Sequence, residues 1–395
     1  MKGARRRFSR RASAACAQRG PVLDTRSAPA RASSEALGPA PQRGSALNAH
    51  FRHASPACIR APRGWRWRAT RSAIGRFQPE QPKESTMLRT PLLAAARSTG
   101  VRKLVEANPL TSSVVDRFVA GTAPEDAVRA TRSLSDQGMH VTLDHLGEDT
   151  LDAGQATATV RAYQRVLAEL AEAGLTGRAE VSVKLSAVGQ FLPKDGEKIA
   201  LENARLICEA AAAAGTTVTL DMEDHTTTDS TLGILADLRV DFPWVGAVLQ
   251  SYLHRTEGDC RDLATAGSRV RLCKGAYAEP ASVAFQGKQE VDRSYVRCLK
   301  VLMNGAGYPM VATHDPRMIA IAGDLAARAR RAPGSFEYQM LYGIRTEEQR
   351  RIAAEGDRLR VYVAYGDEWY GYFMRRLAER PANLVFFLRS LLSNR

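Results

Sequence analysis

Residues 179–224, AEVSVKLSAVGQFLPKDGEKIALENARLICEAAAAAGTTVTLDMED, contain the pattern that decides the fold. The stretch opens with a β-branched, alternating run at 179–185 and closes on a second apolar run at 217–222. Between them lies a longer segment rich in Ala, Leu and Glu, which is typical of a helix. A strand, a helix and a second strand in this order predict two parallel strands joined by a crossover helix.

The same alternation continues in both directions. Short β-branched or apolar runs are followed by helical segments, and eight such units suit a closed β/α barrel of ordinary size. We expect two helices, at 88–107 and 109–119, before the barrel. A doubly wound open sheet is the alternative, but no GxGxxG phosphate turn follows a strand. We therefore predict an α/β protein, a distorted (βα)8 TIM barrel preceded by N-terminal helices and a disordered basic leader. Its strands are expected at 139–143, 179–185, 217–222, 246–251, 270–274, 309–313, 336–340 and 359–364.

The leader, residues 1–86, carries the whole charge excess of the chain. It holds 18 Lys and Arg residues against four acidic ones, which equals the net charge of +14 for all 395 residues. It is rich in Arg, Ala, Ser and Pro and has no hydrophobic periodicity, so it cannot bury enough apolar surface to become ordered. It is a translated upstream stretch with Met87 as the true start, an organelle transit peptide, or a lipid- or nucleic-acid-binding segment centred on residues 65–68 (WRWR).

The body, residues 87–395, is predicted to be one domain without net charge. A neutral body gives no electrostatic reason to bind nucleic acid. The six cysteines form no CxxC pair and have no zinc-site spacing, which favours reduced thiols inside a cell. No apolar run approaches the ~18–20 residues of a membrane helix. We expect a cytoplasmic protein, with at most peripheral contact with the inner face of the membrane.

Polar residues gather where the predicted strands end, which is where β/α barrels carry their chemistry. Lys184 shares the inward face of its strand with Ser182 and Ser186. It is a substrate or anion contact, a Schiff-base amine, or one half of a buried ion pair. Asp221 and Glu223 share one face of the next strand, and we expect Asp221 to pair with Lys184. A metal site is the alternative, but a neighbouring cation favours ion pairing.

The next three strands provide further candidates. Gln250 is a neutral amide that can hydrogen-bond a heterocycle. Arg271 alternates with Val270 and Leu272, so it should point inward, where it needs an anionic or electron-rich partner. The dipeptide 275–276 (GA) should let a ligand approach the backbone closely. His314, beside Thr313, is a cofactor contact or a satisfied polar core residue.

The segment 369–379, WYGYFMRRLAE, predicts a helix with an unusual polar face. Tyr372, Arg375, Arg376 and Glu379 are spaced i, i+3, i+4 and i+7, so they lie on one side. Two guanidinium groups beside a tyrosine suit a carboxylate, because guanidinium binds carboxylates through paired hydrogen bonds. A solvated charged face is the alternative.

Taken in chain order, these motifs resemble the proline dehydrogenase family in its monofunctional bacterial form. The resemblance covers nearly all of residues 88–395 and leaves out the leader. One departure is Cys273, where an aliphatic residue is expected, and its thiol is small and apolar enough to pack there. The motifs are VSVKLSA at 181–187, LDMED at 220–224, VLQSYLHRT at 248–256, RLCKGAY at 271–277, ATHD at 312–315, FEYQMLYG at 336–343 and YFMRRLAERPAN at 372–383.

The resemblance implies non-covalently bound FAD and oxidation of L-proline to Δ1-pyrroline-5-carboxylate, with electrons passing to a membrane quinone. It implies that Arg375 and Arg376 grip the substrate carboxylate and that Glu379 orients them. Asp221 and Arg271 would be catalytic, with Arg271 stabilising the negative charge of the reduced flavin. The remaining substrate-side residues would be Lys184, Leu341, Tyr362 and Tyr372. The FAD contacts would be Met222, Gln250, Arg271, Lys274, Gly275, Ala276, Thr313 and His314.

The expected function implies a partner enzyme, and two rival functions remain open. A pyrroline-5-carboxylate dehydrogenase is expected downstream, no nucleic acid is expected at the body, and the oligomeric state is left open. One rival is a Schiff-base aldolase on the same fold, with Lys184 or Lys274 as the amine. The other is a nucleic-acid-binding protein that acts through residues 1–86, which would bind in a salt-sensitive way.

Overall fold

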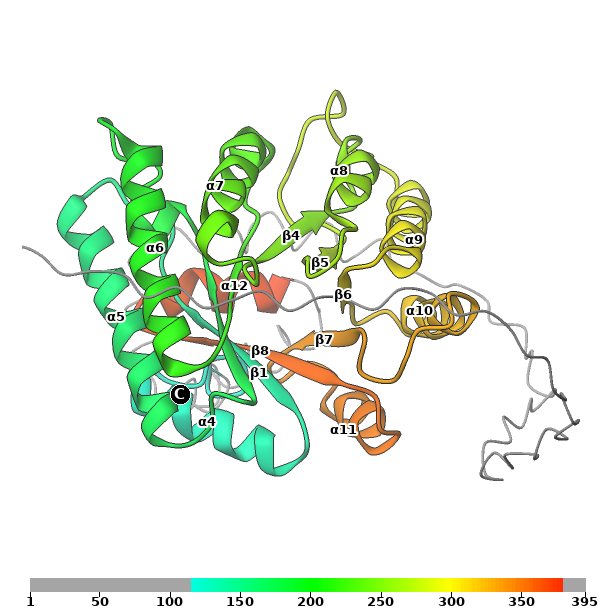
Figure 1. Ribbon diagram of the computed structural model, residues 1–395, viewed down its shortest axis with the longest axis horizontal. Helices are drawn as coiled ribbons and strands as arrows, with labels where there is room; N and C mark the ends of the chain where they lie inside the picture. The colour runs from blue at the N-terminus through cyan, green and yellow to red at the C-terminus, as the bar shows by residue number, and fades with distance from the viewer. Residues whose placement is uncertain (1–114, 379–395) are drawn as a thin grey trace, which may run out of the picture. The chain divides into compact units, whose positions relative to one another are not determined.

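The computed structural model describes residues 115–378, which form a closed barrel of eight parallel strands in sequential order (Figure 1). The last strand pairs with the first, and this closure leaves no free edge. The predicted barrel is therefore confirmed, and each strand lies within two residues of its expected bounds. The strands are β1 (His140–His145), β2 (Ala179–Val183), β3 (Val218–Leu220), β4 (Gly246–Gln250), β5 (Arg269–Cys273), β6 (Tyr308–Ala312), β7 (Glu337–Leu341) and β8 (Leu359–Tyr365).

Helices surround the strands (Figure 1). The expected helix at 88–107 and most of the one at 109–119 fall outside the described residues; from Val115 the chain turns, and Val119 forms a parallel bridge with Ala364. No described helix is both long and apolar enough to cross a membrane. The helices are α4 (Pro124–Asp136), α5 (Ala153–Glu172), α6 (Gly196–Ala214), α7 (Thr228–Asp241), α8 (Thr256–Leu263), α9 (Lys288–Asn304), α10 (Pro316–Arg328), α11 (Thr346–Ala354) and α12 (Trp369–Ala378), with short 3-10 helices η1 (Ser186–Val188) and η2 (His225–Thr227).

The helix α4 was not anticipated, although its sequence carries a start signal. Pro124 stands at the first helical position, where its missing N–H costs nothing. Asp126 accepts a hydrogen bond from the backbone N–H of Ala123 at 3.1 Å, which closes the first turn. Its buried residues pack into the main apolar core, between the helices and the outward face of the strands.

Strand alternation places apolar side chains against the helices and polar ones inside the barrel. Val181 and Val183 belong to the core, whereas Glu180 and Ser182 point inward. At the base, Glu337 accepts from Arg360 at 2.6 Å, and Glu180 accepts from Arg269. Burial raises the pKa of Glu180, but the charges of the nearby arginines outweigh it and hold that pKa below its ordinary range. The base is thus filled by paired charges, and a ligand must enter from the opposite end.

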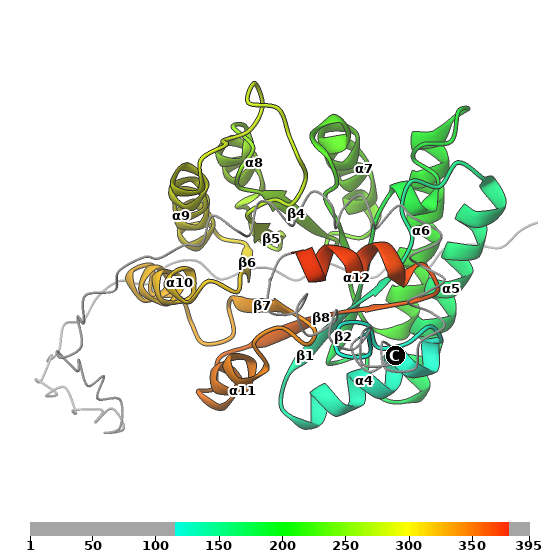
Figure 2. The same cartoon turned by 180° about the vertical axis from the view of Figure 1, so that it is seen from behind.

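The helix α12 covers that opposite end. Its buried residues Phe373 and Leu377 pack in one cluster with Leu146, Ile344 and Ala364, which lie at or just beyond the C-terminal ends of β1, β7 and β8. Figure 2 shows α12, in red, lying in front of the strands. This packing brings Arg375 of α12 to the mouth of the barrel, where it meets Glu148.

Candidate functional site

The mouth of the barrel holds two buried ion pairs, side by side. Lys184 Nζ lies 2.7 Å from both carboxylate oxygens of Asp144. Arg271 Nη1 donates to Asp221 Oδ1 at 2.7 Å and to Ser182 Oγ at 3.0 Å. The Tyr362 hydroxyl donates to the other Asp221 oxygen at 2.7 Å. Arg271 also lies over the Tyr362 ring, 5.2 Å from its centroid.

The prediction that Asp221 pairs with Lys184 is wrong. The register of β1 and β2 sets Asp144 beside Ser182, and Lys184 follows two residues later on the same inward face. Asp221 instead reaches Arg271, which belongs to the next strand but one. Inward side chains of alternate strands share a layer in β/α barrels, so such pairs meet across the interior.

The arrangement of the two carboxylates also argues against the metal site that was the alternative. Asp221 accepts hydrogen bonds from Arg271 and Tyr362. Glu223 instead accepts a hydrogen bond from the Ser186 hydroxyl at 2.6 Å. The two carboxylates therefore do not converge on one point.

The Lys184 amine is unsuited to Schiff-base chemistry. Burial lowers its pKa, but the negative charges of Asp144 and Asp221 outweigh burial and leave the pKa above the ordinary lysine value. A protonated amine is not a nucleophile. The aldolase alternative therefore has no support at this residue.

On α12, Arg375 Nη1 lies 2.6 Å from Glu148 Oε1, in the loop between β1 and α5. Burial lowers the pKa of Arg375, but the charge of Glu148 outweighs it, so the guanidinium stays charged. Arg376 stacks on the Tyr372 ring, one helical turn earlier, at 5.1 Å from the ring centroid. Glu379, the expected orienting residue, lies outside the described residues.

Most predicted cofactor contacts line the rim of the mouth. Gln250 is buried and donates to the Glu223 carbonyl at 2.6 Å. Met222, which directly precedes Glu223, is also buried. The Leu341 N–H donates to His314 Nε2 at 2.9 Å, which places the proton of a neutral ring on Nδ1. Thr313 is buried, and its hydroxyl accepts from the Asp315 N–H.

The residues after β5 follow the prediction less closely. Lys274 points away from the inner pairs and binds Asp292 and Asp315. Gly275 has a φ of +111°, and a Cβ there would stand 2.3 Å from a ring carbon of Tyr252. The Tyr252 ring therefore packs closely against the backbone at Gly275. Ala276 is exposed.

Cys273 behaves as the small apolar residue that was expected of it. Burial raises the pKa of its thiol to about 12, so the group stays neutral. Its sulfur lies 3.5 Å from the Leu249 carbonyl, within the strand pairing of β4 and β5.

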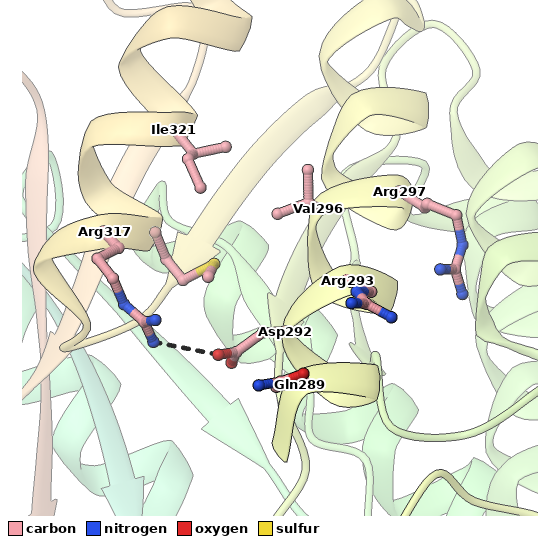
Figure 3. A pocket seen from close by; sticks show the side chains of 8 residues that line it. Gln289, Asp292, Arg293, Val296, Arg297, Arg317 and Ile321 are labelled. Carbon is pink, nitrogen blue, oxygen red and sulfur yellow. Dashed lines mark hydrogen bonds and ion pairs between the residues drawn. The ribbon is translucent and has the colours of Figure 1, made fainter. Parts of the chain in front are cut away.

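A groove of about 710 Å³ lies outside the barrel, between α9 and α10 (Figure 3). Arg293 and Arg317 line it together with Val296 and Ile321, and Arg317 is paired with Asp292 at its edge. None of the predicted site residues lines this groove. The convergence of buried charges makes the mouth, rather than the groove, the candidate site.

Sequence reasoning missed three residues of the mouth. Asp144 stands one residue beyond the expected end of the first strand, and Glu148 lies in the loop that follows. Tyr277 is partly exposed, and its pKa is raised by burial first and then by the charges of Glu223 and Glu148. The sequence signal for the first two was the acidic pattern LDHLGED at 143–149, after a β-branched run.

Comparison with known proteins identifies the family. A family model described as proline dehydrogenase matches residues 127–389. The chain is 40% identical over 276 residues to proline dehydrogenase 1 of Bacillus subtilis (strain 168), which covers 70% of this chain and 90% of that protein. It is 40% identical over 282 residues to the proline dehydrogenase of Deinococcus radiodurans, with 71% and 90% covered. The resemblance stated from the motifs is confirmed.

Longer proteins match over part of their length. The chain is 27% identical to the bifunctional protein PutA of Escherichia coli, but it covers only 24% of that protein. Among solved structures, proline utilization A of Bdellovibrio bacteriovorus, inactivated by N-propargylglycine, has a TM-score of 0.64 at 23% identity, with 74% of this chain and 36% of that chain covered. The Bradyrhizobium japonicum protein has a TM-score of 0.59 at 22% identity, with 80% and 35% covered. At this identity the structures support the fold alone.

Proposed function

Because this chain belongs to the proline dehydrogenase family, we propose that it uses FAD to oxidise L-proline to Δ1-pyrroline-5-carboxylate and passes the electrons to a quinone. The observation that carries the proposal is the position of Arg375 on α12. Arg375 lies at the mouth, bound to Glu148 of the β1–α5 loop, and the negative charge of Asp144 inside the barrel contributes to its raised pKa. Arg375 and the buried pairs therefore face one space.

The residues present fit a flavin beside β5. Within residues 115–378, Nε and Nη2 of Arg271 are buried and have no hydrogen-bond acceptor, although Nη2 lies 3.8 Å from Glu180. Buried donors of this kind normally have partners, and flavin nitrogen and oxygen atoms are suitable acceptors. Gln250, Thr313 and His314 would hold the cofactor from the neighbouring strand ends. FAD, when bound, supplies the acceptor for a hydride from the carbon next to the proline nitrogen.

The protein's own groups would orient the substrate. Arg375 and Arg376 would bind the carboxylate through charge-assisted hydrogen bonds and so fix the five-membered ring in one pose. Tyr362, held by Asp221, would form a wall of the pocket with Leu341 and Tyr372. The arginines and Lys184 would favour the unprotonated amine, because a second positive charge beside them is repelled.

The wider assignments belong to the same proposal. Residues 87–395 would form the catalytic domain, with residues 1–86 taking no part in the chemistry; the match of the family model to 127–389 supports this. Reoxidation by a membrane quinone implies peripheral contact with the inner face of the membrane. The product would be consumed by a pyrroline-5-carboxylate dehydrogenase, and bifunctional relatives support that sequence of reactions. A chain that starts at Met87 should retain full proline turnover.

The test uses purified protein and its absorbance spectrum under anaerobic conditions. We expect flavin absorbance that bleaches when L-proline is added. Arg375→Ala and Arg376→Ala should each raise KM for proline by about 10- to 100-fold, as expected for losing a charge-assisted hydrogen bond, while flavin stays bound. Arg351→Ala is the matched control, since within residues 115–378 Arg351 forms ion pairs only with Glu348 and Glu355 on the helix surface.

Two outcomes would reject the proposal. A colourless protein without proline-dependent reduction would remove the flavin. Turnover with an unchanged KM in both arginine variants would remove the carboxylate role.

A further inference from the structure

A chain of contacts that begins in the buried interior links the end of β3 to Arg375 on α12. It begins at Glu223, which is 6% exposed. Both carboxylate oxygens are used by one residue: Ser186 donates its N–H at 3.1 Å and its hydroxyl at 2.6 Å. Burial raises the pKa of Glu223 to about 7, against the lowering effect of its two hydrogen bonds from Ser186.

The second link runs from Ser186 to the β1–α5 loop. Ser186 Oγ accepts from the Asp149 N–H at 3.1 Å, and its carbonyl accepts from the Thr150 N–H at 3.1 Å. Asp149 has a φ of +56°, a left-handed conformation that is uncommon for residues other than glycine. The surrounding contacts must therefore hold the loop in this shape.

The third link is the ion pair of that loop with α12. Glu148 directly precedes Asp149, and its Oε1 lies 2.6 Å from Arg375 Nη1. The Glu148 side chain is 32% exposed, so side-chain packing does little to place it. Its position follows from the backbone, which Ser186 holds.

We infer that Ser186 and Glu223 are positioning residues for Arg375, because they fix the loop from which Glu148 holds the guanidinium at the mouth. The inference rests on the proposed role of Arg375 in binding the substrate carboxylate. A long arginine side chain that is ordered beforehand loses less entropy when the substrate binds. Losing either residue should therefore weaken proline binding without slowing the step that follows.

The experiment is a double-mutant cycle on the full-length flavin-loaded enzyme. Ser186→Ala, Glu223→Ala and Glu148→Ala should each raise KM for proline about tenfold, with kcat within about twofold of wild type. Glu223→Gln keeps an acceptor for the Ser186 N–H and replaces the other acceptor by an amide N–H that can donate to the Ser186 hydroxyl oxygen, so it should restore a near-wild-type KM. In an Arg375→Ala background, Ser186→Ala should raise KM no further, because the residue that it positions is gone.

Asn203→Ala is the matched control. Asn203 donates to the Val188 carbonyl at 2.9 Å, so its loss loosens η1 without touching the β1–α5 loop. A similar rise in KM for Asn203→Ala would mean that the KM effect of Ser186→Ala comes from general loosening of η1, and it would overturn the inference. An unchanged KM in Glu148→Ala, a substitution at a partly exposed loop residue, would overturn it as well.

The cycle separates the two levels of the argument. If Arg375→Ala alone leaves KM unchanged, the proposed carboxylate role falls, and this inference falls with it. If Arg375→Ala raises KM and Ser186→Ala multiplies it by its full factor again, only the positioning role is overturned.

Discussion

Replacing Lys184 by methionine would leave the buried Asp144 carboxylate without its cation. The Asp144 side chain is 1% exposed, and both its oxygens contact Lys184 Nζ at 2.7 Å. Removing one partner of such a pair costs about 3–5 kcal/mol, because the remaining charge is buried and uncompensated. The free energy of unfolding of a domain is only about 5–15 kcal/mol, so Lys184→Met should be folded but clearly weakened.

The loss should depend on pH in a defined direction. Burial already raises the pKa of Asp144, against the lowering effect of Lys184, and without the lysine this pKa rises further. A carboxyl that binds its proton more tightly when folded stabilises the protein at low pH and loses that stabilisation as pH rises. The deficit of Lys184→Met relative to wild type should therefore be small below the raised folded-state pKa of Asp144 in wild type, and above that pKa it should grow by about 1.4 kcal/mol per pH unit until Asp144 ionises in the folded variant.

Urea denaturation at several pH values between about 5 and 8 measures this deficit, with the slope m checked for constancy. The matched control is the double variant Lys184→Met with Asp144→Leu, which replaces the pair by apolar groups and should recover most of the stability. Equal stability of Lys184→Met and wild type at pH 8, or a double variant no more stable than the single one, would refute the reasoning.

Two further predictions concern a buried arginine outside the site and a glycine just after β5. Arg331→Ala should lower the free energy of unfolding by about 2–4 kcal/mol, because it leaves several carbonyls of the α9–β6 connection without donors; KM for proline should not change, and urea denaturation with steady-state kinetics decides this. The Arg331 guanidinium donates to the carbonyls of Leu302, Met303, Gly305, Gly307 and Ser335. Gly275→Ala should lower the melting temperature and weaken flavin retention, since the new methyl would meet the Tyr252 ring at a residue with φ of +111°. Gly258→Ala on α8, where no atom lies within 4 Å of the new Cβ, is its control, and equal melting temperatures for the two variants would contradict the steric argument.

The fold was predictable because a buried parallel strand has a plain sequence signature. The apolar residues of the run at 181–183 alternate with polar residues that fill the barrel interior, and a helical segment follows before the next apolar run. Strand ends were less predictable. The first strand continues to His145, beyond the expected residue 143, because Asp144 and His145 still pair with β8, and sequence pattern does not show pairing.

The partners of the site residues were harder to predict than their location. The sequence placed Lys184, Asp221 and Arg271 at strand ends facing inward, and the structure has them there. It could not tell which carboxylate meets which cation, because that depends on strand register and on layers shared by alternate strands. Asp144 therefore took the place expected for Asp221. Glu148 could not be predicted as the partner of Arg375, since only the docking of α12 over the mouth brings the two together.

The buried charges of this barrel differ in how completely they are satisfied, and the difference marks the site. At the base, Glu337 and Glu180 are matched by Arg360 and Arg269. At the mouth, Nε of Arg271 is buried without a hydrogen bond to residues 115–378, and its Nη2 has only a longer ion pair with Glu180, at 3.8 Å. A buried donor without an acceptor is costly, and under the proposed function a flavin atom would supply the acceptor. Because Arg271 stands on a strand of the barrel, its position does not depend on the loops that admit the substrate. The flavin-facing side of the site would then be rigid, whereas the carboxylate-facing side depends on contacts between α12 and the β1–α5 loop.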